Sequence, residues 1–485
     1  MKPFRYRFSK LLNPVIVNRS GSNIRINGIY SKGTFLLNIP PGKVEYIEIP
    51  VLTENEILTP EEAGNAATVE MKTVKAYTFF CVAGSEFAEG GDGSESNPWA
   101  SVNYALNQLQ PIIDCFVKTY CCEYIQLRCS GVCNYEVHNI EKGIWGNWSS
   151  FDGKNRFILS GLNVEIDFED SQTFEDSQDL GTYDPVQVEY EKKAIGGVRN
   201  TIFLFSKTSV SVAIEAFSNR EKSYVHCGSR AAGFDGCSGI FYLCEANVNS
   251  SSISNGKNSG GGMSSYSDAV AYGFRLCDGT FIQAKSNANA SGEAISRTED
   301  DQEKVSEGNA RGYSFYSCTG NFYSCTGKGI GISKGTTGRQ LYYAADSEGI
   351  GFSSCRGNFY SCTGYGEAAA NALNNLSRGI VKVVAYGFSS CSDSFYSCNS
   401  ESDASGTGYA CEVESFGFYS FHGNNNILIS CSANAKSVAS GQEYLYRACG
   451  FLNCKADFYD CSSSERICES NGTYKTNCEN FECDI

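Results

Sequence analysis

Apolar residues recur in the second half of the chain in short blocks with a regular spacing. From about residue 227 a unit reads Gly-Phe-x-x-Cys, a short turn and Phe-x-x-Cys, and in complete units the two cysteines are seven residues apart. The units begin at 233, 273, 312, 351, 387, 417 and 450, so the period is 30 to 40 residues. The repeat contains no stripe of apolar residues at i, i+3, i+4 and i+7, which is the pattern of an amphipathic helix. Short strands separated by three-residue turns therefore predict a β-solenoid, in which each unit packs on its neighbours.

Stacking of coil on coil places equivalent residues above one another, so the repeat predicts an interior ladder of phenylalanines and thiols. A buried free cysteine behaves as a small hydrophobic residue, which favours a structural role over metal or redox chemistry. Alternating small residues after the second cysteine predict a third short strand, and a variable Gly-, Ser- and Asn-rich loop then returns to the next unit. The expected ladder comprises Phe234, Cys237, Phe241, Cys244, Phe352, Cys355, Phe359, Cys362, Phe388, Cys391, Phe395, Cys398, Phe451, Cys454, Phe458 and Cys461.

The first sixty residues have a different pattern. They contain no cysteine and few glycines, and alternating apolar and polar runs separated by turn signals predict a small antiparallel β module. The expected organisation is a β module at 1–60, a linker or neck at 61–75, the solenoid entry and first coils at 76–226, the repeat coils at 227–465 and a C-terminal cap at 466–485.

Composition narrows the classes of partner and compartment. With 39 basic and 54 acidic residues the net charge is −15, which disfavours nucleic-acid binding. No run approaches the ~18 apolar residues of a membrane helix, so no membrane insertion is expected. The N-terminus lacks the apolar core and cleavage site of a secretory signal. The 24 cysteines are therefore expected to be mostly free thiols, made in a reducing cytoplasm.

The segment 77–106 carries a second pattern: a strand ending near Gly84, a Gly/Asp/Ser-rich loop, Asn97-Pro98-Trp99, and an amphipathic helix from about Val102 to Leu109. This arrangement resembles the entry segment of right-handed parallel β-helix proteins of the pectate-lyase-like superfamily. The resemblance covers roughly 76–465 as architecture and implies an all-β fold with a right-handed parallel β-helix. It carries no catalytic motif.

The acidic segment 165–179 is the first candidate for chemistry, because it repeats Phe-Glu-Asp-Ser-Gln at a six-residue offset. Hydrolysis of a glycosidic bond needs two carboxylates, and calcium needs several oxygen ligands. Asp167, Glu169 and Asp170 are the candidate catalytic residues. A solvated acidic loop or strand edge is the simpler interpretation, and the sequence favours it.

Two tryptophans, Trp145 and Trp148, are candidate binding residues, since exposed aromatic rings stack on sugars. The alternative is that they plug the edge of the solenoid. Cys129 and Cys133, near His138, have a spacing that resembles a zinc half-site, but no second spaced pair follows. We therefore expect no metal and no cofactor.

The layout of a small N-terminal β module, a neck and a long β-helix resembles phage tail spikes and tail fibres. That resemblance implies a virion appendage, usually a homotrimer, which contacts other virion proteins through its N-terminal module and binds a host surface glycan or receptor. Such a protein is made in the host cytoplasm without a signal peptide and ends up in the virion. The alternative is a polysaccharide hydrolase or lyase on the same scaffold, which a groove with two carboxylates roughly 5–9.5 Å apart would indicate. A bacterial surface adhesin would need a signal and an anchor, and neither is visible.

Overall fold

The structure is a computed structural model, and it describes side chains from residue 78 onward, apart from some positions beside the gaps between its segments. The residues described are 7–18, 24–30, 33–39, 44–46, 59–62, 67–86, 88–109, 124–138, 157–174, 186–199, 201–218, 224–258, 263–298, 304–337, 343–373, 379–420, 427–440, 443–452, 457–459, 461–463 and 467–471.

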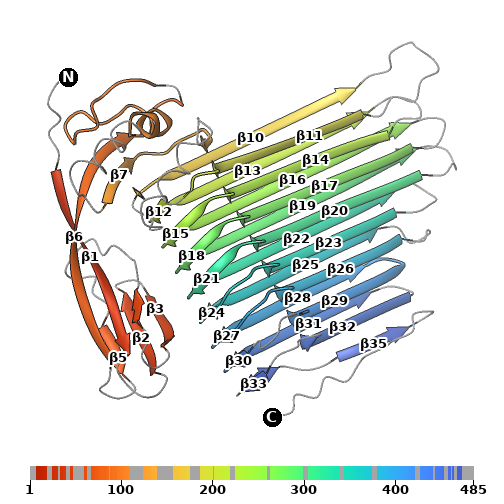
Figure 1. Ribbon diagram of the computed structural model, residues 1–485. Coiled ribbons are helices and arrows are strands. Elements are labelled where there is room, and N and C mark those ends of the chain that lie inside the picture. The colour runs from red at the N-terminus through yellow and green to blue at the C-terminus, as the bar shows by residue number, and fades with distance from the viewer. Residues whose placement is uncertain are drawn as a thin grey trace.

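The chain winds into a right-handed parallel β-helix, and the predicted all-β class and architecture are confirmed (Figure 1). One coil consists of β14 (Tyr224–Asp235), β15 (Ser238–Tyr242) and β16 (Glu245–Asn258), and β17 (Met263–Arg275) then begins the next coil. Each strand pairs in parallel with its equivalent one coil later, as β14 pairs with β17. Three sheets result, which we call the returning sheet (the β14 position), the short-strand sheet (β15) and the outgoing sheet (β16).

The strands of each sheet follow the chain order. The rest of the returning sheet comprises β8 (Val137–His138), β11 (Val186–Gly196), β20 (Lys304–Tyr316), β23 (Tyr343–Ser353), β26 (Gly379–Ser389), β29 (Ala410–Tyr419), β32 (Glu443–Leu452) and β35 (Ile467–Asn471). The rest of the outgoing sheet comprises β10 (Asn163–Phe174), β13 (Lys207–Ser218), β19 (Lys285–Thr298), β22 (Thr326–Thr337), β25 (Thr363–Leu373), β28 (Asn399–Thr407), β31 (Ser432–Ser440) and β34 (Ser462–Ser463). The short-strand sheet contains β7 (Tyr124–Ser130), β9 (Phe157–Ser160), β12 (Thr201–Leu204), β18 (Asp278–Ile282), β21 (Thr319–Tyr323), β24 (Phe359–Tyr360), β27 (Phe395–Tyr396), β30 (Ile427–Ile429) and β33 (Asp457–Tyr459).

The expected return loops are mostly strand, so that expectation is wrong. β16 runs to Asn258 and β17 begins at Met263, which leaves only 259–262 between them. The third strand, expected to be short, is 14 residues long in this coil. Gly, Ser and Asn have low intrinsic strand propensity, but here pairing to the coils above and below decides the conformation.

Small residues are required because the outgoing and returning sheets face each other much more closely than the ~10 Å usual for packed sheets. A Cβ added at Gly349 would lie 1.9 Å from the backbone oxygen of Glu367 on the opposite sheet. The Ser229 and Ser250 hydroxyls hydrogen-bond across the same space at 2.8 Å. At these positions the coil is therefore thin between its two long sheets, and it is wider at the short-strand sheet.

Phenylalanine rings fill the wide end in two continuous stacks. In one stack the Phe315 and Phe352 centroids are 4.6 Å apart, and in the other those of Phe322 and Phe359 are 4.7 Å apart. The two stacks meet edge to face, with 5.8 Å between Phe322 and Phe352. These four side chains are fully buried, so they exclude water along the whole axis and add aromatic contacts to the area term.

The cysteines sit at the two corners that flank each short strand. At one corner Ser317 has a φ of 50°, the left-handed region that disfavours a side chain. The backbone N–H of Ser317 donates to the Ser353 carbonyl at 2.9 Å, and the Cys318 thiol donates to the Phe274 carbonyl of the preceding coil at 3.4 Å. Burial raises the pKa of this thiol well above its ordinary value. The cysteine therefore acts as a small apolar residue and a weak donor that joins successive coils.

The described ladder positions repeat this geometry. Cys237, Cys277, Cys318, Cys355 and Cys391 form one column, and Cys244, Cys325, Cys362, Cys398, Cys431 and Cys461 form the other, with Ala284 in the place of one thiol. The predicted ladder residue Cys454 lies outside the described residues. The strand that contains Phe458 is described, but its side chain is not.

The N-terminal strands pair in antiparallel fashion and are β1 (Arg7–Asn18), β2 (Ile24–Tyr30), β3 (Gly33–Ile39), β4 (Val44–Tyr46), β5 (Thr59–Glu62) and β6 (Ala67–Val82). The long strand β6 pairs antiparallel with β1 and parallel with β7. One sheet thus continues from the module into the solenoid. β6 begins within the segment 61–75 expected to be a neck; the domain boundaries themselves stay a prediction.

The entry and exit of the solenoid differ from its coils. Residues 102–109 are helical, as the sequence predicts, and the Val102 N–H donates to the Tyr135 hydroxyl at 3.1 Å. Trp99 is buried and stacks on Phe79 at 5.3 Å. At the other end β35 pairs antiparallel with β32, which covers the edge of the returning sheet. No helix among the described residues is long and apolar enough to cross a membrane.

We expect Gly349→Ala to lower the free energy of unfolding by about 1–3 kcal/mol or more, because the added methyl group overlaps a backbone oxygen that cannot move without breaking strand pairing. Gly228→Ala is the matched control, since the nearest atom there is the Cγ of the flexible Glu189 side chain at 3.0 Å. Urea denaturation followed by circular dichroism measures both variants. Equal stability of the two would contradict the close approach of the long sheets.

Candidate functional site

A hollow on the outward face of the returning sheet is the candidate site. Glu189, Gly228 and Asp268 occupy the same register position in three successive coils, and the glycine contributes no side chain to that column. The result is a shallow pocket of about 150 Å³. One water needs roughly 10–15 Å³ on this measure, so the pocket has room for a small organic group. It is lined by Glu189, Tyr190, Glu191, Gly228, Arg230 and Asp268.

The carboxylates around this hollow differ in how they are held. Glu189 lies 3.2 Å from the His226 Nδ1 atom, and Glu191 accepts a hydrogen bond from Arg275. The Asp268 Oδ1 atom is buried and has no hydrogen-bond partner among the described residues. Two walls of the hollow are therefore fixed by neighbouring side chains, whereas the Asp268 Oδ1 atom is enclosed by the protein.

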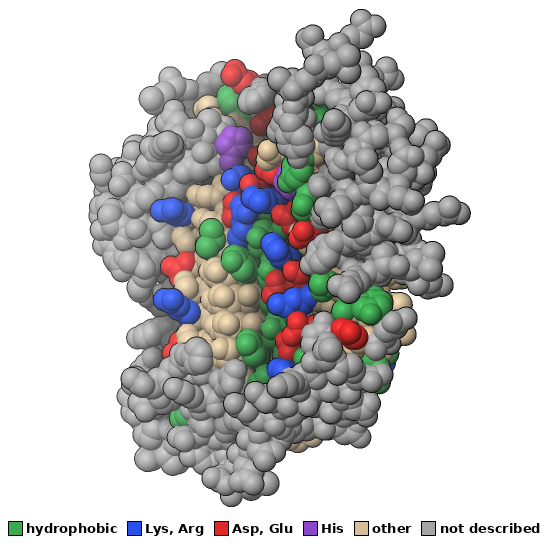
Figure 2. Space-filling model, turned by 90° about the vertical axis from the view of Figure 1, so that its right-hand side faces the viewer, with side chains coloured by type: hydrophobic (Ala, Val, Ile, Leu, Met, Phe, Trp, Pro, Cys, Tyr) green, Lys and Arg blue, Asp and Glu red, His purple; other side chains and the backbone are tan. Residues whose placement is uncertain are grey.

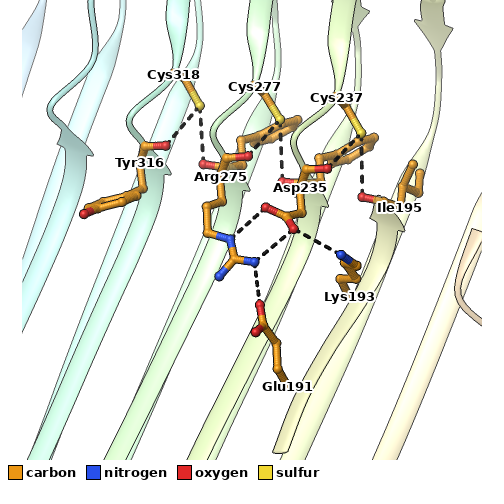
Figure 3. Close-up of polar contacts among 11 residues, drawn as sticks. Glu191, Lys193, Ile195, Asp235, Cys237, Arg275, Cys277, Tyr316 and Cys318 are labelled. Atoms are coloured by element: carbon orange, nitrogen blue, oxygen red, sulfur yellow. Dashed lines mark hydrogen bonds and ion pairs between the residues drawn. The ribbon is translucent and has the colours of Figure 1, made fainter. Parts of the chain in front are cut away.

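A network of charges fixes one edge of the hollow and spans three coils (Figure 3). Arg275 on β17 donates from Nε and Nη2 to the two carboxylate oxygens of Asp235 on β14, at 2.7 and 2.9 Å. The same Nη2 donates to Glu191 on β11 at 2.5 Å, and the Lys193 Nζ lies 3.5 Å from Asp235. The Arg275–Asp235 ion pair is bidentate and partly buried. Arg275 therefore holds Glu191 more firmly than an arginine in an exposed ion pair would.

The electrostatics of this network favour the charged state of Asp235. Burial alone raises the pKa of its carboxyl group, but hydrogen bonds and charge from Arg275 and Lys193 outweigh burial and hold that pKa below its usual value. The Arg275 guanidinium also lies 5.1 Å from the centre of the Tyr272 ring. The network is therefore an ionic link between coils at neutral pH.

Further along the same face the outward side chains become aromatic. Tyr272, Tyr313, Ile350 and Tyr386 follow one another in a single register column, and Ile350 is almost fully buried. The Tyr313 hydroxyl donates to Glu348 at 2.5 Å. Figure 2 shows lysine, arginine and acidic side chains gathered in a band along the stacked coils, beside hydrophobic side chains. We call this strip, from the hollow to Tyr386, the mixed face.

The sequence-predicted catalytic residues do not meet in a groove. All three lie on β10. Asp167 and Glu169 point outward, whereas the Asp170 side chain lies on the opposite face of the strand. There Asp170 accepts a hydrogen bond from Gln172 at 2.8 Å. Hydrogen bonds from Gln172 and Tyr190 lower the pKa of Asp170, the opposite of what a proton donor needs.

The candidate tryptophans lie outside the described residues, and the cysteines of the candidate zinc half-site pack in the interior. Trp145 and Trp148 lie outside the described residues. Cys81 and Cys129 contact each other through their sulfur atoms at 3.4 Å, and Cys133 is buried nearby. No group of three or more His, Cys, Asp or Glu side chains in the described ranges is placed to hold a metal ion.

Sequence reasoning missed the hollow and the aromatic column. A signal for the column does exist, since the residue two positions before the first phenylalanine of each unit is large in Tyr272, Tyr313, Ile350 and Tyr386. The hollow has no such signal, because Gly228 resembles any other glycine of a Gly-rich chain. Gly228 leaves a pocket only because it lies on the outward face between Glu189 and Asp268.

We expect Arg275→Met to destabilise the protein by about 2–3 kcal/mol at pH 7, because it leaves the Asp235 carboxylate buried with only Lys193 nearby. The folded-state pKa of Asp235 is depressed, so the link contributes above the unfolded pKa and is lost as the pH falls through the folded pKa. The difference between wild type and variant should therefore shrink in acid.

Urea denaturation at pH 7 and in the acid range tests this. Lys334→Met is the control, because its ion pair with Glu293 spans 3.9 Å and is exposed, and its loss should cost less than about 0.5 kcal/mol at either pH. A pH-independent cost of Arg275→Met would show that packing, not charge, carries its effect.

Comparison with known proteins returns nothing that assigns the chain to a family. No family model matches the sequence. No curated protein and no solved structure matches it either.

Proposed function

We propose that this chain is a structural virion appendage of the phage tail-spike or tail-fibre type, with the β-helix as its shaft. The observation that carries the proposal is the shared strand β6, which pairs with β1 of the N-terminal module and with β7 of the solenoid. A load applied to the module would pass into the shaft through backbone hydrogen bonds rather than through a flexible linker. Such continuity suits a protein that must project rigidly from a particle.

The proposed ligand is a glycan or receptor on the host surface, bound along the mixed face. Carboxylates and guanidinium groups beside the partly exposed rings of Tyr272 and Tyr386 suit the hydroxyls and apolar faces of sugars. The hollow at Gly228 provides one polar subsite, with the carboxylates that line it as acceptors and Arg230 as a donor. In this proposal the chain is a homotrimer, and the N-terminal module contacts other virion proteins.

A polysaccharide hydrolase is the second candidate. Glu189 and Asp268 face each other across the hollow from strands two coils apart, and neighbouring strands are about 4.8 Å apart. Two such spacings put their backbones about 9.6 Å apart, at the upper limit of the ~6.5–9.5 Å between the carboxyl groups of inverting glycosidases. Release of reducing ends that Glu189→Gln and Asp268→Asn each abolish would favour this candidate over simple binding.

Assembly is tested first, with the full chain. We expect light scattering to give the mass of a trimer, and electron microscopy of the source particles to show the shaft projecting from the virion, with antibodies to residues 1–60 labelling its base. A monomer that no particle carries would reject the appendage proposal.

Binding is tested separately. We expect Gly228→Leu to weaken binding to an array of bacterial surface polysaccharides by about tenfold or more, a loss of at least ~1.4 kcal/mol, because the side chain fills the hollow. Ser291→Leu, exposed on the outgoing sheet, is the control and should bind as wild type does. Equal binding by wild type, Gly228→Leu and Ser291→Leu would show that the ligand does not bind in the hollow.

A further inference from the structure

Two thiols face each other where the N-terminal module meets the solenoid. Cys81 on β6 and Cys129 on β7 are register partners in parallel strands. The Cys81 thiol donates to the Cys129 sulfur, with 3.4 Å between the two sulfur atoms. This pair lies on the strand contact that joins the module to the first coil, outside the repeat and outside the mixed face.

The surroundings of this pair differ from those of the ladder thiols. In the ladder each thiol is directed to backbone carbonyl groups, as the Cys355 sulfur lies 3.5 and 3.4 Å from the carbonyl oxygens of Phe315 and Ser353, either of which can accept its hydrogen. Ladder thiols also interact with one another, whereas the hydrogen bond of the Cys81 thiol goes to the Cys129 sulfur and not to a carbonyl group. Oxidation of two ladder cysteines would break several hydrogen bonds to the preceding coil, whereas oxidation of Cys81 and Cys129 breaks only the bond between them.

The backbone geometry permits a bond. Cα atoms of neighbouring strands are about 4.8 Å apart, within the ~4.4–6.8 Å that disulfides span. Both residues lie one position before the end of their strands, at Val82 and Ser130, and Gly131 follows with a φ of 87°. Strand ends can make the small rotation that brings the sulfur atoms to bonding distance.

Access to the pair is one-sided. Cys81 is buried, whereas Cys129 is only partly buried. Although the Cys129 side chain packs against the core, Cys129 is the more exposed residue of the pair, and we expect a small-molecule disulfide to react there first. The neighbouring Cys81 thiol and burial raise the pKa of Cys129 well above its ordinary value, so exchange is slow at neutral pH and faster in mild alkali.

We propose that Cys81 and Cys129 form a disulfide when the protein moves from reducing to oxidising surroundings, and that this bond fastens the module strand to the first coil. The oxidant is a small-molecule disulfide such as oxidised glutathione. The Cys129 thiolate attacks it, forms a mixed disulfide and releases one glutathione thiol. The Cys81 thiolate then attacks the Cys129 sulfur and releases the second glutathione. Two protein thiols are oxidised and one glutathione disulfide is reduced, with no other reactant.

The experiment uses the full chain, first reduced and then equilibrated with oxidised glutathione at mildly alkaline pH. Free thiols are blocked with an alkylating reagent under denaturing conditions, and the protein is digested without reduction for mass spectrometry. We expect one cross-linked peptide pair, joining Cys81 to Cys129, while the described ladder cysteines are alkylated. The oxidised protein should melt about 3–4 °C higher than the reduced one, because the bond closes a long loop in a large domain.

Matched variants make the outcome decisive. Cys81→Ser/Cys129→Ser should abolish the melting shift, and Cys355→Ser/Cys391→Ser, which removes a stacked pair from the ladder, should retain it. The proposal fails if Cys81 and Cys129 remain free, if either is joined to Cys133 instead, or if ladder pairs oxidise equally. This inference stands apart from the proposed function, because it depends on neither a virion nor a ligand.

Discussion

The structure depends on register-locked stacking of one coil on the next. Parallel pairing holds equivalent backbone groups about one strand spacing apart, so each side chain meets its equivalent in the neighbouring coils. Phenylalanine rings then form face-to-face stacks such as Phe359 on Phe395, at 4.5 Å. The same repetition lets the Cys362 thiol reach the Phe322 carbonyl of the coil before it. Both contacts are unavailable to a single coil, which explains why the fold needs many repeats.

Stacking also sets the shape of the coil. The rings require width at the short-strand sheet, whereas the two long sheets come together so closely that glycine, serine and alanine line the space between them. Gly329 and Gly366 illustrate this, since an added Cβ would lie 2.2 and 2.3 Å from backbone oxygens of Ile350 and Tyr386. Only small side chains fit where the sheets approach this closely, whereas in other coils buried residues such as Val212 and Val383 fill the space between them.

The outward face shows how a regular array acquires a local site. Equivalent outward residues lie one above another but differ in type from coil to coil, so an exception in one coil creates a feature that its neighbours lack. Gly228 is such an exception between Glu189 and Asp268. The ionic link from Arg275 to Asp235 is another, since the equivalent positions in the next coils are Tyr316 and Ser353. Both exceptions fall in the first complete coils, and together they concentrate polar chemistry near the N-terminal end of the shaft.

The sequence by itself determined the solenoid, its corners and the entry helix, because these depend on short-range patterns: the Gly-Phe-x-x-Cys spacing, the three-residue turns and the apolar face of residues 102–109. It misassigned the Gly- and Ser-rich segments as loops, because their strand conformation comes from pairing between coils rather than from local propensity. Only the tertiary structure decided which outward residues meet. Asp235 and Arg275 are 40 residues apart, and their contact exists because coil length and register place them side by side. A change of one residue in a coil would move every such partner to the opposite face.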